Sequence, residues 1–459
     1  MTYLFVAVFL CMMGYTSYYA ITHQQELINN SYNGRQELLV QQNTRGTIYA
    51  AGGQILAETQ TDEDEKEHRV YPYENLFAHA VGYASNGKFG IEALANYYLI
   101  NSNAKLADKV ASDVAGVKYP GDSVVTTLDV GLQEVAFQSL GIYKGAVIVS
   151  EPATGKILAM VSKPDYDPNK IDEIWQELIE DKDSTVLLNR ATQGLYPPGS
   201  TFKIVTALEY IRENPDTYDQ YTYQCNGRFT SGQDMINCYH GSVHGAEDFT
   251  KSFAKSCNAS FANIGMQLDR SHFNDTLNGL LFNQELPVSF AYNKSKLTIS
   301  DTTSDADIMQ AAIGQGKTQI TPLHLNMITS AIANQGMLMK PYMVDYVKNK
   351  EGSIIKQFNP DAYKRLLSQE EAAALTDLMK EVVESGTGTK LSGLTYTAAG
   401  KTGSAEYSSV KTESHAWFTG FAPAESPEVC VTIIIEGAGS GGDYAVPIAK
   451  RIFDEYFGE

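Results

Sequence analysis

The sequence predicts an α+β protein in which a large domain follows a small mixed α and β pedestal and an apolar N-terminal segment. Three observations predict this class. With 459 residues, the chain is long enough for two domains. Strand-like runs lie near both ends of residues 122–459, and helical patterns fill the stretch between them. Strands from both ends with helices in the middle indicate one sheet closed by the ends of its own domain.

The composition is that of a globular protein, and its acidity argues against one class of partner. Hydrophobic residues make up 43% of the chain, which suits a protein with a buried core. The net charge of −19 argues against nucleic-acid binding, which needs clustered Lys and Arg. We expect the acidic residues to lie on a solvated surface.

The N-terminal segment predicts a membrane anchor over residues 1–22. Residues 3–21 contain no charged side chain and are just long enough to span a bilayer. No Lys or Arg precedes this run and no A-x-A-like site follows it, so an uncleaved anchor is favoured over a signal peptide. We expect a single pass with the remainder of the chain outside the cell, although the missing basic flank leaves orientation open under the positive-inside rule.

The pedestal is expected over residues 23–121. A polar stretch up to Gln42 predicts a helical stalk. The run 45–58 has two strand-like segments around a glycine turn, which is typical of a hairpin. Residues 90–100 read as an amphipathic helix, and 101–121 as a connecting region.

The large domain is expected over residues 122–459, and its elements are assigned in chain order. A hairpin is predicted from strands 145–150 and 156–162 around the turn 151–155. Strands are also predicted in the runs "HAWFTGFAP" and "EVCVTIIIEG", followed by a last helix over 446–457. Helical patterns in the middle cover residues 201–213, 307–313, 324–334 and 369–384.

The cysteines leave one question open and predict no metal site. Cys225 and Cys238 flank a short loop, and outside the cell they could form a disulfide worth about 3 kcal/mol in the chain-entropy model. Two free thiols are the alternative. No second Cys or His pair stands at ligand spacing, so we expect no zinc site. His240, His244 and His415 are read as structural.

The segment "YPPGSTFK" predicts an activated serine nucleophile at the start of a buried helix. Gly199 permits a tight turn, and Ser200 then lies at a helix N-terminus, where developing negative charge is stabilised. Lys203 follows on the same helical face. A lysine can act as the base for a serine if burial or a second cation keeps its amine neutral.

Ser-x-x-Lys alone is a weak signal, and its context decides between nucleophile and helix cap. Five further Ser-x-x-Lys sequences occur in the chain, at Ser85, Ser102, Ser252, Ser353 and Ser408. Two other motifs follow Ser200 in order, Ser256-Cys257-Asn258 and Lys401-Thr402-Gly403. Sets of this kind, S-x-x-K with an S-D-N-like motif and K-T-G, mark β-lactamases and penicillin-binding proteins.

With these motifs in order, the chain resembles the class B penicillin-binding proteins, which are monofunctional, membrane-anchored D,D-transpeptidases of peptidoglycan synthesis. The likeness also includes "LLNRATQGLYPPGSTFKIVTAL", "AAIGQGKTQITPLHLNMITSAIANQG" and "AAGKTGSAE". It covers residues 122–459 closely and 45–100 loosely. The fold that it implies is the serine β-lactamase-like one, an antiparallel sheet flanked by helices.

The resemblance implies a catalytic role for three residues. Ser200 would be the acylated nucleophile and Lys203 its general base. Ser256 would pass a proton between Lys203 and the leaving or attacking amine. The backbone N–H groups of Ser200 and Ser404 would form the oxyanion hole.

The resemblance also implies a substrate-binding set. Asn258 would hydrogen-bond the substrate amide, and Lys401 would hold a carboxylate and keep Lys203 deprotonated. Thr402 and Ser404 would offer hydroxyls to that carboxylate. Gly403, which lacks a side chain, would let substrate lie against the strand.

The implied reaction is acyl transfer between peptidoglycan stem peptides, with β-lactams acylating the same serine. It needs no metal or organic cofactor. The implied partner is a membrane glycosyltransferase of the shape, elongation, division or sporulation type. One rival within acyl-enzymes is a β-lactamase or D,D-carboxypeptidase, for which we find no deacylating base. Another is a β-lactam sensor or a catalytically idle cell-wall scaffold, although all three motifs are intact.

The sequence differs from what is usual or possible in related proteins at two places, and it contains one glycine-rich segment that is similar to a phosphate loop. The family usually has Asp-Arg-Asn-Gly where this chain has Ala50-Ala51-Gly52-Gly53, which puts pedestal contacts in doubt. The stretch before residue 122 is too short for a glycosyltransferase domain. Gly314-Gln315-Gly316 lacks the spacing of a phosphate loop, so we expect no nucleotide site.

Overall fold

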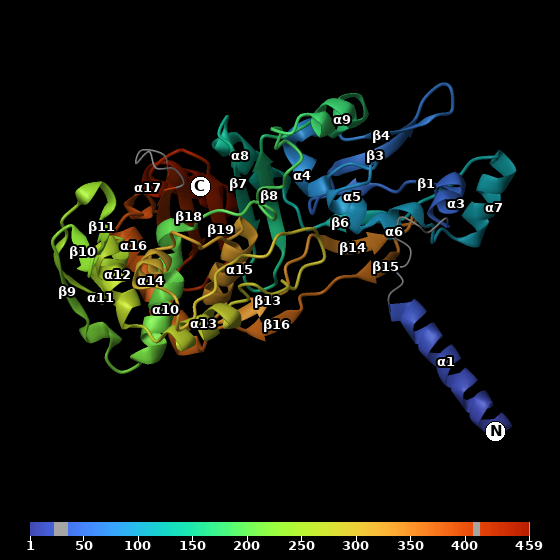
Figure 1. The fold of residues 1–459 in the computed structure, drawn as a ribbon. Helices are drawn as coiled ribbons and strands as arrows, with labels where there is room; N and C mark the ends of the chain where they lie inside the picture. The colour runs from blue at the N-terminus through green and yellow to red at the C-terminus, as the bar shows by residue number, and fades with distance from the viewer. Residues whose placement is uncertain (23–34, 407–413, 459) are drawn as a thin grey trace.

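The protein is described here by a computed structural model that covers residues 1–22, 35–406 and 414–458. An N-terminal helix, a pedestal and a larger domain follow one another along the molecule (Figure 1). The apolar helix α1 (Thr2–Thr22) stands apart from the other elements. Among the residues described, its stretch Thr2–Tyr19 is the one candidate for a membrane span. The stalk expected up to Gln42 lies outside the described residues except for α3 (Arg35–Gln42).

The pedestal is built on a six-stranded sheet with the order β15-β14-β6-β2-β3-β4. The hairpin expected over 45–58 is confirmed, since β2 and β3 pair antiparallel. On one side β6 pairs parallel with β2, and on the other it pairs antiparallel with β14. Strands β14 and β15 come from much later in the chain than the other four, so both parts of the molecule contribute to this sheet. Its members are β2 (Ile48–Tyr49), β3 (Ile55–Thr61), β4 (Glu67–Val70), β6 (Ser123–Thr126), β14 (Val344–Lys348) and β15 (Ile354–Gln357).

The pedestal helices differ from expectation at two places. The helix expected over 90–100 is interrupted at Ala95, whose φ of −99° and ψ of 10° lie outside the helical range. The region 101–121 contains a helix, α7, and not only a connection. The remaining short elements are β1 (Asn43–Thr44), η1 (Glu74–Phe77), α4 (Ala78–Val81), α5 (Gly90–Leu94), α6 (Asn96–Ile100), α7 (Leu106–Ala115) and β5 (Tyr119–Pro120).

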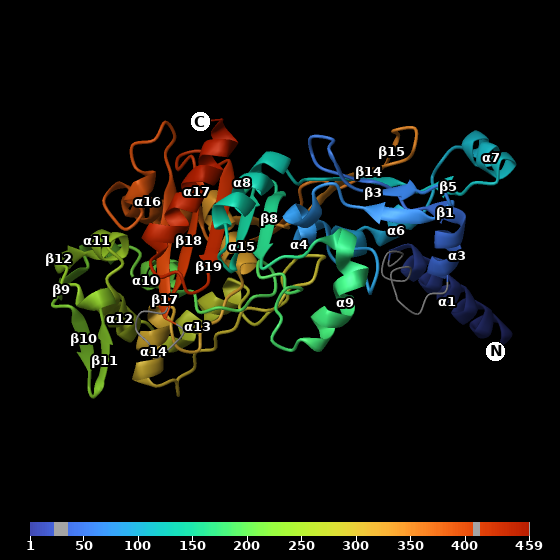
Figure 2. The same ribbon diagram turned by 90° about the horizontal axis from the view of Figure 1, so that it is seen from above.

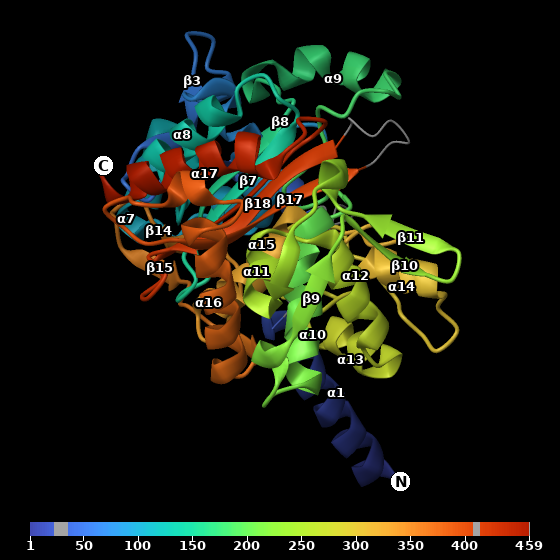
Figure 3. The same ribbon diagram turned by 90° about the vertical axis from the view of Figure 1, so that its left-hand side faces the viewer.

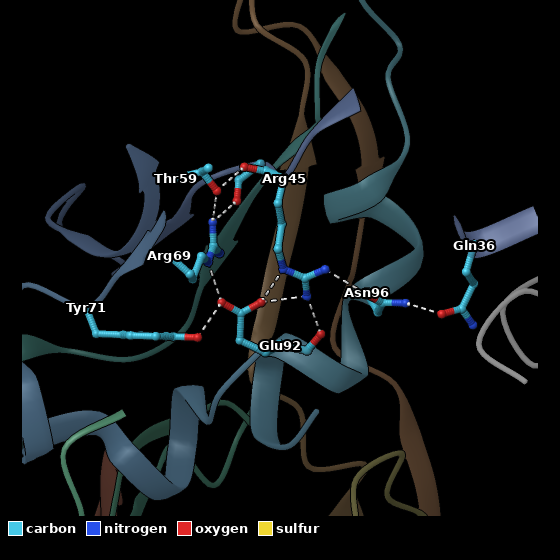
Figure 4. Close-up of polar contacts among 8 residues, drawn as sticks. Gln36, Arg45, Thr59, Arg69, Tyr71, Glu92 and Asn96 are labelled. Atoms are coloured by element: carbon cyan, nitrogen blue, oxygen red, sulfur yellow. Dashed lines mark hydrogen bonds and ion pairs between the residues drawn. The ribbon is translucent and has the colours of Figure 1, made fainter. Parts of the chain in front are cut away.

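A buried ion-pair network on Glu92 holds the pedestal together (Figure 4). The Nε atoms of Arg45 and Arg69 each donate to one Glu92 carboxylate oxygen at 2.6 Å, and the Tyr71 hydroxyl donates at 3.3 Å. Burial raises the pKa of Glu92, but the two guanidinium groups outweigh it and hold that pKa below its usual value. The network joins β4, α5 and the segment before β2, and none of residues 50–53 takes part in these bonds.

The larger domain contains a five-stranded antiparallel sheet with the order β17-β18-β19-β7-β8. The prediction of a sheet closed by its own ends is confirmed, because β19 pairs with β7 over Ile435↔Gly145 to Cys430↔Ser150. The β7–β8 hairpin also forms as predicted. The strands are β7 (Gly145–Ser150), β8 (Ile157–Lys163), β17 (Ala399–Glu406), β18 (Ser414–Ala422) and β19 (Val429–Ile435).

Helices cover both faces of this sheet (Figure 2). On one face α8 and α17 pack against apolar side chains such as Val147, Phe418 and Ile433. On the other, α15 packs against residues that include Ile148, Trp417 and Ile434. Helix α17 begins at Gly441 and not at 446 as expected. These helices are α8 (Val130–Leu140), α15 (Pro322–Ala333) and α17 (Gly441–Phe457).

The helices expected in the middle of the chain are present, and small strands lie beside them. Figure 1 shows β9, β10, β11 and α12 gathered at the end of the molecule far from α1, and Figure 3 looks directly at that end. The helical elements are η2 (Pro168–Lys170), α9 (Ile171–Glu180), η3 (Gly199–Phe202), α10 (Lys203–Glu213), η4 (Tyr218–Gln220), η5 (Tyr239–Gly241), α11 (Phe249–Ala254), α12 (Asn258–Gln267), α13 (Arg270–Gly279), α14 (Asp305–Ala312), α16 (Gln369–Glu384) and η6 (Thr389–Leu391). The strands are β9 (Thr222–Cys225), β10 (Arg228–Ser231), β11 (Asp234–Asn237), β12 (Gly245–Asp248), β13 (Met337–Met339) and β16 (Ala362–Arg365).

Candidate active site

Ser200 lies in the short helix η3, one turn before α10. Gly199 has a φ of +53°, which glycine adopts without strain, and this confirms the tight turn expected before the serine. The Trp417 indole N–H donates to the Pro197 carbonyl at 3.1 Å and fixes the approach to the turn. Ser200 is therefore presented by a rigid backbone at the surface of a cavity.

Gly314 holds the other side of that turn. The Gly199 N–H donates to the Gly314 carbonyl at 2.9 Å. A Cβ atom at Gly314, whose φ is +73°, would lie 2.1 Å from the Gly199 carbonyl oxygen. Because Gly314 has no side chain, the backbone of this segment can approach the serine turn closely. This packing accounts for the glycine at position 314.

Lys203 is fully buried, and its amine is directed at the second motif. Its Nζ donates to the Ser256 carbonyl at 2.7 Å, to the Ser256 hydroxyl at 3.2 Å and to Asn258 Oδ1 at 2.8 Å. These three bonds use all the donors of an ammonium group. In the part of the chain that the structure describes, the Ser200 hydroxyl makes no hydrogen bond, so Lys203 and Ser200 engage only after a rearrangement of these bonds.

Ser256 stands at a strained turn between α11 and α12. Its φ of +58° is unusual for a residue with a Cβ atom and is the kind of strain found at functional sites. Cys257, and not Ser256 or Asn258, caps α12, since its Sγ accepts the Ser260 N–H. Asn258 Nδ2 donates to the Asn237 carbonyl at the end of β11. The side chains of Ser256 and Asn258 are thereby free to face the lysines.

Lys401 lies on the opposite side of the Ser256 hydroxyl. It is fully buried on β17, and its Nζ donates to Ser256 Oγ at 3.0 Å and to the Thr402 carbonyl at 3.2 Å. Burial lowers the pKa of Lys203 to about 8. Burial, and then the charge of Lys203, lower the pKa of Lys401 well below its usual value. Two amines sharing one hydroxyl in a desolvated site do not both hold a full positive charge at neutral pH.

The third motif forms the open edge of the five-stranded sheet. Strand β17 is the first in the sheet order, so one side of its backbone is unpaired within that sheet. The Thr402 and Thr387 hydroxyls form a hydrogen bond of 2.5 Å, and Ser404 Oγ accepts the Gly441 N–H at 3.3 Å. The edge therefore presents hydroxyl groups beside the two lysines.

Gly403 also makes room for the serine turn. A Cβ atom there would lie 2.9 Å from the Pro198 carbonyl oxygen and 3.1 Å from Thr201 Cγ2. Because side chains alternate along a strand, the space left by Gly403 is on the Ser200 side of the sheet edge. The glycine lets the serine turn pack against β17.

The three motifs meet at one cavity of about 510 Å³. Its lining includes Ser200, Ser256, Asn258, Thr402, Gly403 and Ser404, so the structure brings these predicted residues together, and buried Lys203 and Lys401 reach it through Ser256. A second hollow, of about 580 Å³, shares Ser200, Asn258 and Ser404 with the first.

Sequence reasoning missed some of the lining. Thr387, in the loop that follows α16, bonds the K-T-G threonine and lines the cavity. Tyr239 and Lys390 line it as well. A Gly-Thr-Gly-Thr segment is no recognisable site signal by itself, because only the packing of α16 against β17 brings it to the third motif.

The cysteines answer one open question and form a cluster that linear spacing does not indicate. The Sγ atoms of Cys225 and Cys238 lie 3.7 Å apart, and all five thiols are free, so the two residues form no disulfide here. The side-chain N and S atoms of Cys225, Cys238, His244 and Cys257 all lie within 4.8 Å of one another. They come from four separate segments, which no linear spacing rule detects.

Comparison with known proteins identifies the family. Residues 145–454 match the penicillin binding protein transpeptidase domain, and residues 45–124 match the penicillin binding protein A dimerisation domain. The chain therefore belongs to the penicillin-binding protein transpeptidases, as the three motifs predicted.

Individual relatives agree with this assignment. The chain is 32% identical to the peptidoglycan D,D-transpeptidase PbpA of Mycolicibacterium smegmatis, over 88% of this chain and 87% of that protein. A ceftriaxone acyl-enzyme complex of penicillin-binding protein A from M. tuberculosis superposes with a TM-score of 0.82 at 28% identity, covering 92% and 99% of the two chains. The D,D-transpeptidase domain of a peptidoglycan glycosyltransferase from Eggerthella lenta gives 0.82 at 29% identity, covering 91% and 99%.

Proposed function

We propose that this chain is a serine D,D-transpeptidase that cross-links peptidoglycan stem peptides and is acylated by β-lactams at Ser200. One observation carries the proposal: the Ser256 hydroxyl lies between two buried lysine amines, and Ser200 stands at the cavity that this hydroxyl faces. Such an arrangement moves protons to and from a serine nucleophile.

In the first half-reaction, Ser200 Oγ attacks the carbonyl carbon of the D-Ala-D-Ala bond, and its proton passes to the neutral amine of Lys203. The proton then moves through Ser256 to the leaving nitrogen, the C–N bond breaks and D-Ala departs. In the second half, the amine of a neighbouring stem attacks the ester, loses its proton by the same route, and Ser200 is regenerated. The backbone N–H groups of Ser200 and Ser404 stabilise the oxyanion in both halves.

The binding roles follow the chemistry of the cavity wall. Lys401, Thr402 and Ser404 are assigned to the substrate carboxylate, because the two hydroxyls line the cavity at the edge of β17 and the buried Lys401 amine reaches the cavity through the Ser256 hydroxyl. Asn258 is assigned to the substrate amide. The two hollows that share Ser200 support transfer to a second peptide, since donor and acceptor approach one serine from different sides.

We further propose the cellular arrangement. Residues 1–22 would anchor the chain with a single pass, residues 23–121 would form the pedestal domain and residues 122–459 the transpeptidase domain outside the cell. The apolar composition of α1 supports the anchor. A membrane glycosyltransferase would be the partner that supplies glycan strands to this transpeptidase.

The test is the intact mass of the purified full chain after incubation with benzylpenicillin, followed over hours. We expect one stable adduct, located on the peptide that contains Ser200. Ser200→Ala should abolish this adduct. Ser353→Ala is the control and should not change it, because Ser353 belongs to a Ser-x-x-Lys sequence in the exposed loop between β14 and β15. An adduct that forms and disappears quickly would indicate hydrolysis, and no adduct in the wild-type chain would indicate a scaffold.

A further inference from the structure

Helix α7 of the pedestal carries its apolar side chains on the outside of the molecule. Leu106, Val110 and Val114 follow one another at four-residue intervals, so they share one face of the helix. Their exposed fractions are 78%, 52% and 86%, and Val117, just after the helix, is 60% exposed. We call these four side chains the apolar face of α7.

The opposite, polar side of α7 faces the protein. Ser112 is the buried residue of this helix, and Asp108 and Lys109 are half-buried. The Lys109 amine donates to the Ser102 carbonyl at 2.9 Å. A helix at a protein surface normally packs its apolar stripe on the core and shows its polar residues to water. Helix α7 has the reverse arrangement, which indicates that a surface outside this chain covers the apolar face.

Helix α3 adds exposed apolar side chains at the same end of the pedestal. Leu38 and Val40 on α3 are both exposed. Helix α3 leads directly into β1 and α7 is followed by β5, and these two short strands pair in parallel with Asn43 opposite Tyr119. Figures 1 and 2 both show α3 and α7 at the end of the molecule that is far from β10 and β11. Two helices therefore present apolar side chains at one end of the pedestal.

This end of the pedestal is also the part that lies next to the proposed anchor along the chain. Helix α1 ends at Thr22 and α3 begins at Arg35. The segment that separates them spans at most about 45 Å even when it is fully extended. Since α7 lies at the same end of the pedestal as α3, its apolar face is within reach of the bilayer that α1 would cross.

The charges around α7 suit a lipid surface. Lys105 precedes the helix, Lys109 lies within it and Lys118 follows it. These lysines outnumber the acidic residues of the same stretch, Asp108 and Asp113, in a chain whose net charge is −19. At a membrane interface a lysine lays its methylene groups along the apolar region and extends its amine to the headgroup phosphates. The segment is therefore compatible with anionic headgroups, unlike the acidic remainder of the chain.

We propose that α7 is an interfacial helix whose apolar face rests on the lipid bilayer that holds α1. The inference rests on the anchor proposed above and adds a second membrane contact to it. Helices of this kind lie in the plane of the membrane, with their apolar side chains about 5–10 Å into the boundary between headgroups and acyl chains. One spanning contact and one lying contact fix the orientation of the pedestal, and the shared sheet passes that orientation on to the catalytic part.

The first test places an environment-sensitive fluorophore on α7 of the full chain, reconstituted in vesicles of phosphatidylethanolamine and phosphatidylglycerol. The chain carries Cys11→Ser, because the other four thiols are buried, and this background without a new cysteine measures unwanted labelling. A nitrobenzoxadiazole label at Val114→Cys should emit at shorter wavelength than in water and lose intensity when nitroxide-bearing lipids are included. Ile142→Cys is the matched control, because Ile142 is an exposed apolar residue between α8 and β7, and its label should show neither effect.

Three results would overturn the proposal. Emission at Val114 equal to that at Ile142, in chain that floats with the vesicles, would leave the apolar face to a partner protein. Self-quenching of the Val114 label that grows with the ratio of protein to lipid would place a second copy of the chain there. Chain that does not float with the vesicles would contradict the anchor itself, and flotation therefore separates failure of the anchor from failure of the α7 contact.

The second test removes the apolar face while the label stays at Val114→Cys. Leu106→Ser together with Val110→Ser should abolish the shift to shorter wavelength. Ala111→Ser together with Ala115→Ser is the control, since these residues are also exposed on α7, and it should preserve the shift. Acylation by fluorescent penicillin in detergent should be the same in both chains, which shows that the fold and the proposed acyl transfer are intact. Retention of the shift in the Leu106→Ser, Val110→Ser chain would overturn the role of the apolar face.

Discussion

Lys203 and Lys401 both contact the same oxygen: their amines lie 3.2 Å and 3.0 Å from the hydroxyl of Ser256. The two side chains come from a helix and an edge strand that are almost two hundred residues apart along the sequence, at positions 203 and 401. Both are fully buried, so each amine is desolvated beside a potential like charge. At neutral pH the two amines together therefore bind fewer protons than the amines of two exposed lysines would.

The rate of β-lactam acylation should rise with pH up to about 8 and then level off. Burial lowers the pKa of Lys203 to about 8, and a general base acts in its neutral form. Below that pKa the neutral fraction falls as pH falls, so the rate should decline about 10-fold per pH unit. Stopped-flow measurement with a fluorescent penicillin between pH 6 and 9 tests this. A flat profile would remove Lys203 as the titrating base.

Loss of the Ser256 hydroxyl should slow acylation by about 10²–10⁴-fold, the usual contribution of a positioned proton-transfer group. Ser256→Gly is the informative variant, because glycine adopts the φ of +58° without strain. Ser242→Ala is the control, since Ser242 lines the same cavity and its hydroxyl bonds only the Tyr239 carbonyl among the residues described. Equal rates for the Ser256→Gly and wild-type chains would exclude the relay.

Gly314→Ala should displace the serine turn and slow acylation by about 100-fold, the effect of a misplacement of about 1 Å. The new Cβ atom would lie 2.1 Å from the Gly199 carbonyl oxygen, which cannot remain where it is. Gly393→Ala is a matched control, because Gly393 has nearly the same φ, +71° against +73°, with nothing within 4 Å of a Cβ atom. If both variants were acylated at the same rate, the backbone contact would have no catalytic importance.

Glu92→Gln should destabilise the protein by about 3–5 kcal/mol, because it leaves two buried guanidinium groups without their counter-charge. The free energy of unfolding of the full chain in detergent measures this, with the exposed Glu63→Gln as control. The same network sets a pH dependence. Since Arg45 and Arg69 hold the pKa of Glu92 below its unfolded value, its stabilisation is present above that unfolded value and is lost as pH falls through the folded pKa. Unchanged stability in Glu92→Gln would contradict this account.

Features that depend on local sequence could be predicted. Each of the three motifs is a short run with its own turn or strand signal, so the sequence alone predicts that Ser200, Ser256 and Lys401 belong to one site. The β7–β8 hairpin follows from two apolar runs around a tight turn, and α16 from the helical pattern of residues 369–384.

Features that depend on long-range pairing could not be predicted. Strand β14 joins β6 across more than two hundred residues of sequence, from Val344 to Thr126, and no local pattern specifies that partner. Cys225, Cys238, His244 and Cys257 lie together although they come from segments that only packing brings into contact. The contact of Gly403 with Pro198 was missed for the same reason, because a glycine shows where space is needed but not what fills it.

The shared pedestal sheet also determines how mechanical load travels through the molecule. The chain passes between the two parts after β6, before β14 and after β15, so the parts are joined by three covalent crossings. A single linker would let the catalytic part swivel freely above its anchor, whereas three crossings resist torsion. A push or pull delivered to the pedestal would reach helix α15 through β14 and β13, and α15 packs directly on the sheet whose edge strand carries Lys401. The three crossings therefore couple the orientation of the pedestal to that of the catalytic part more tightly than a single linker would.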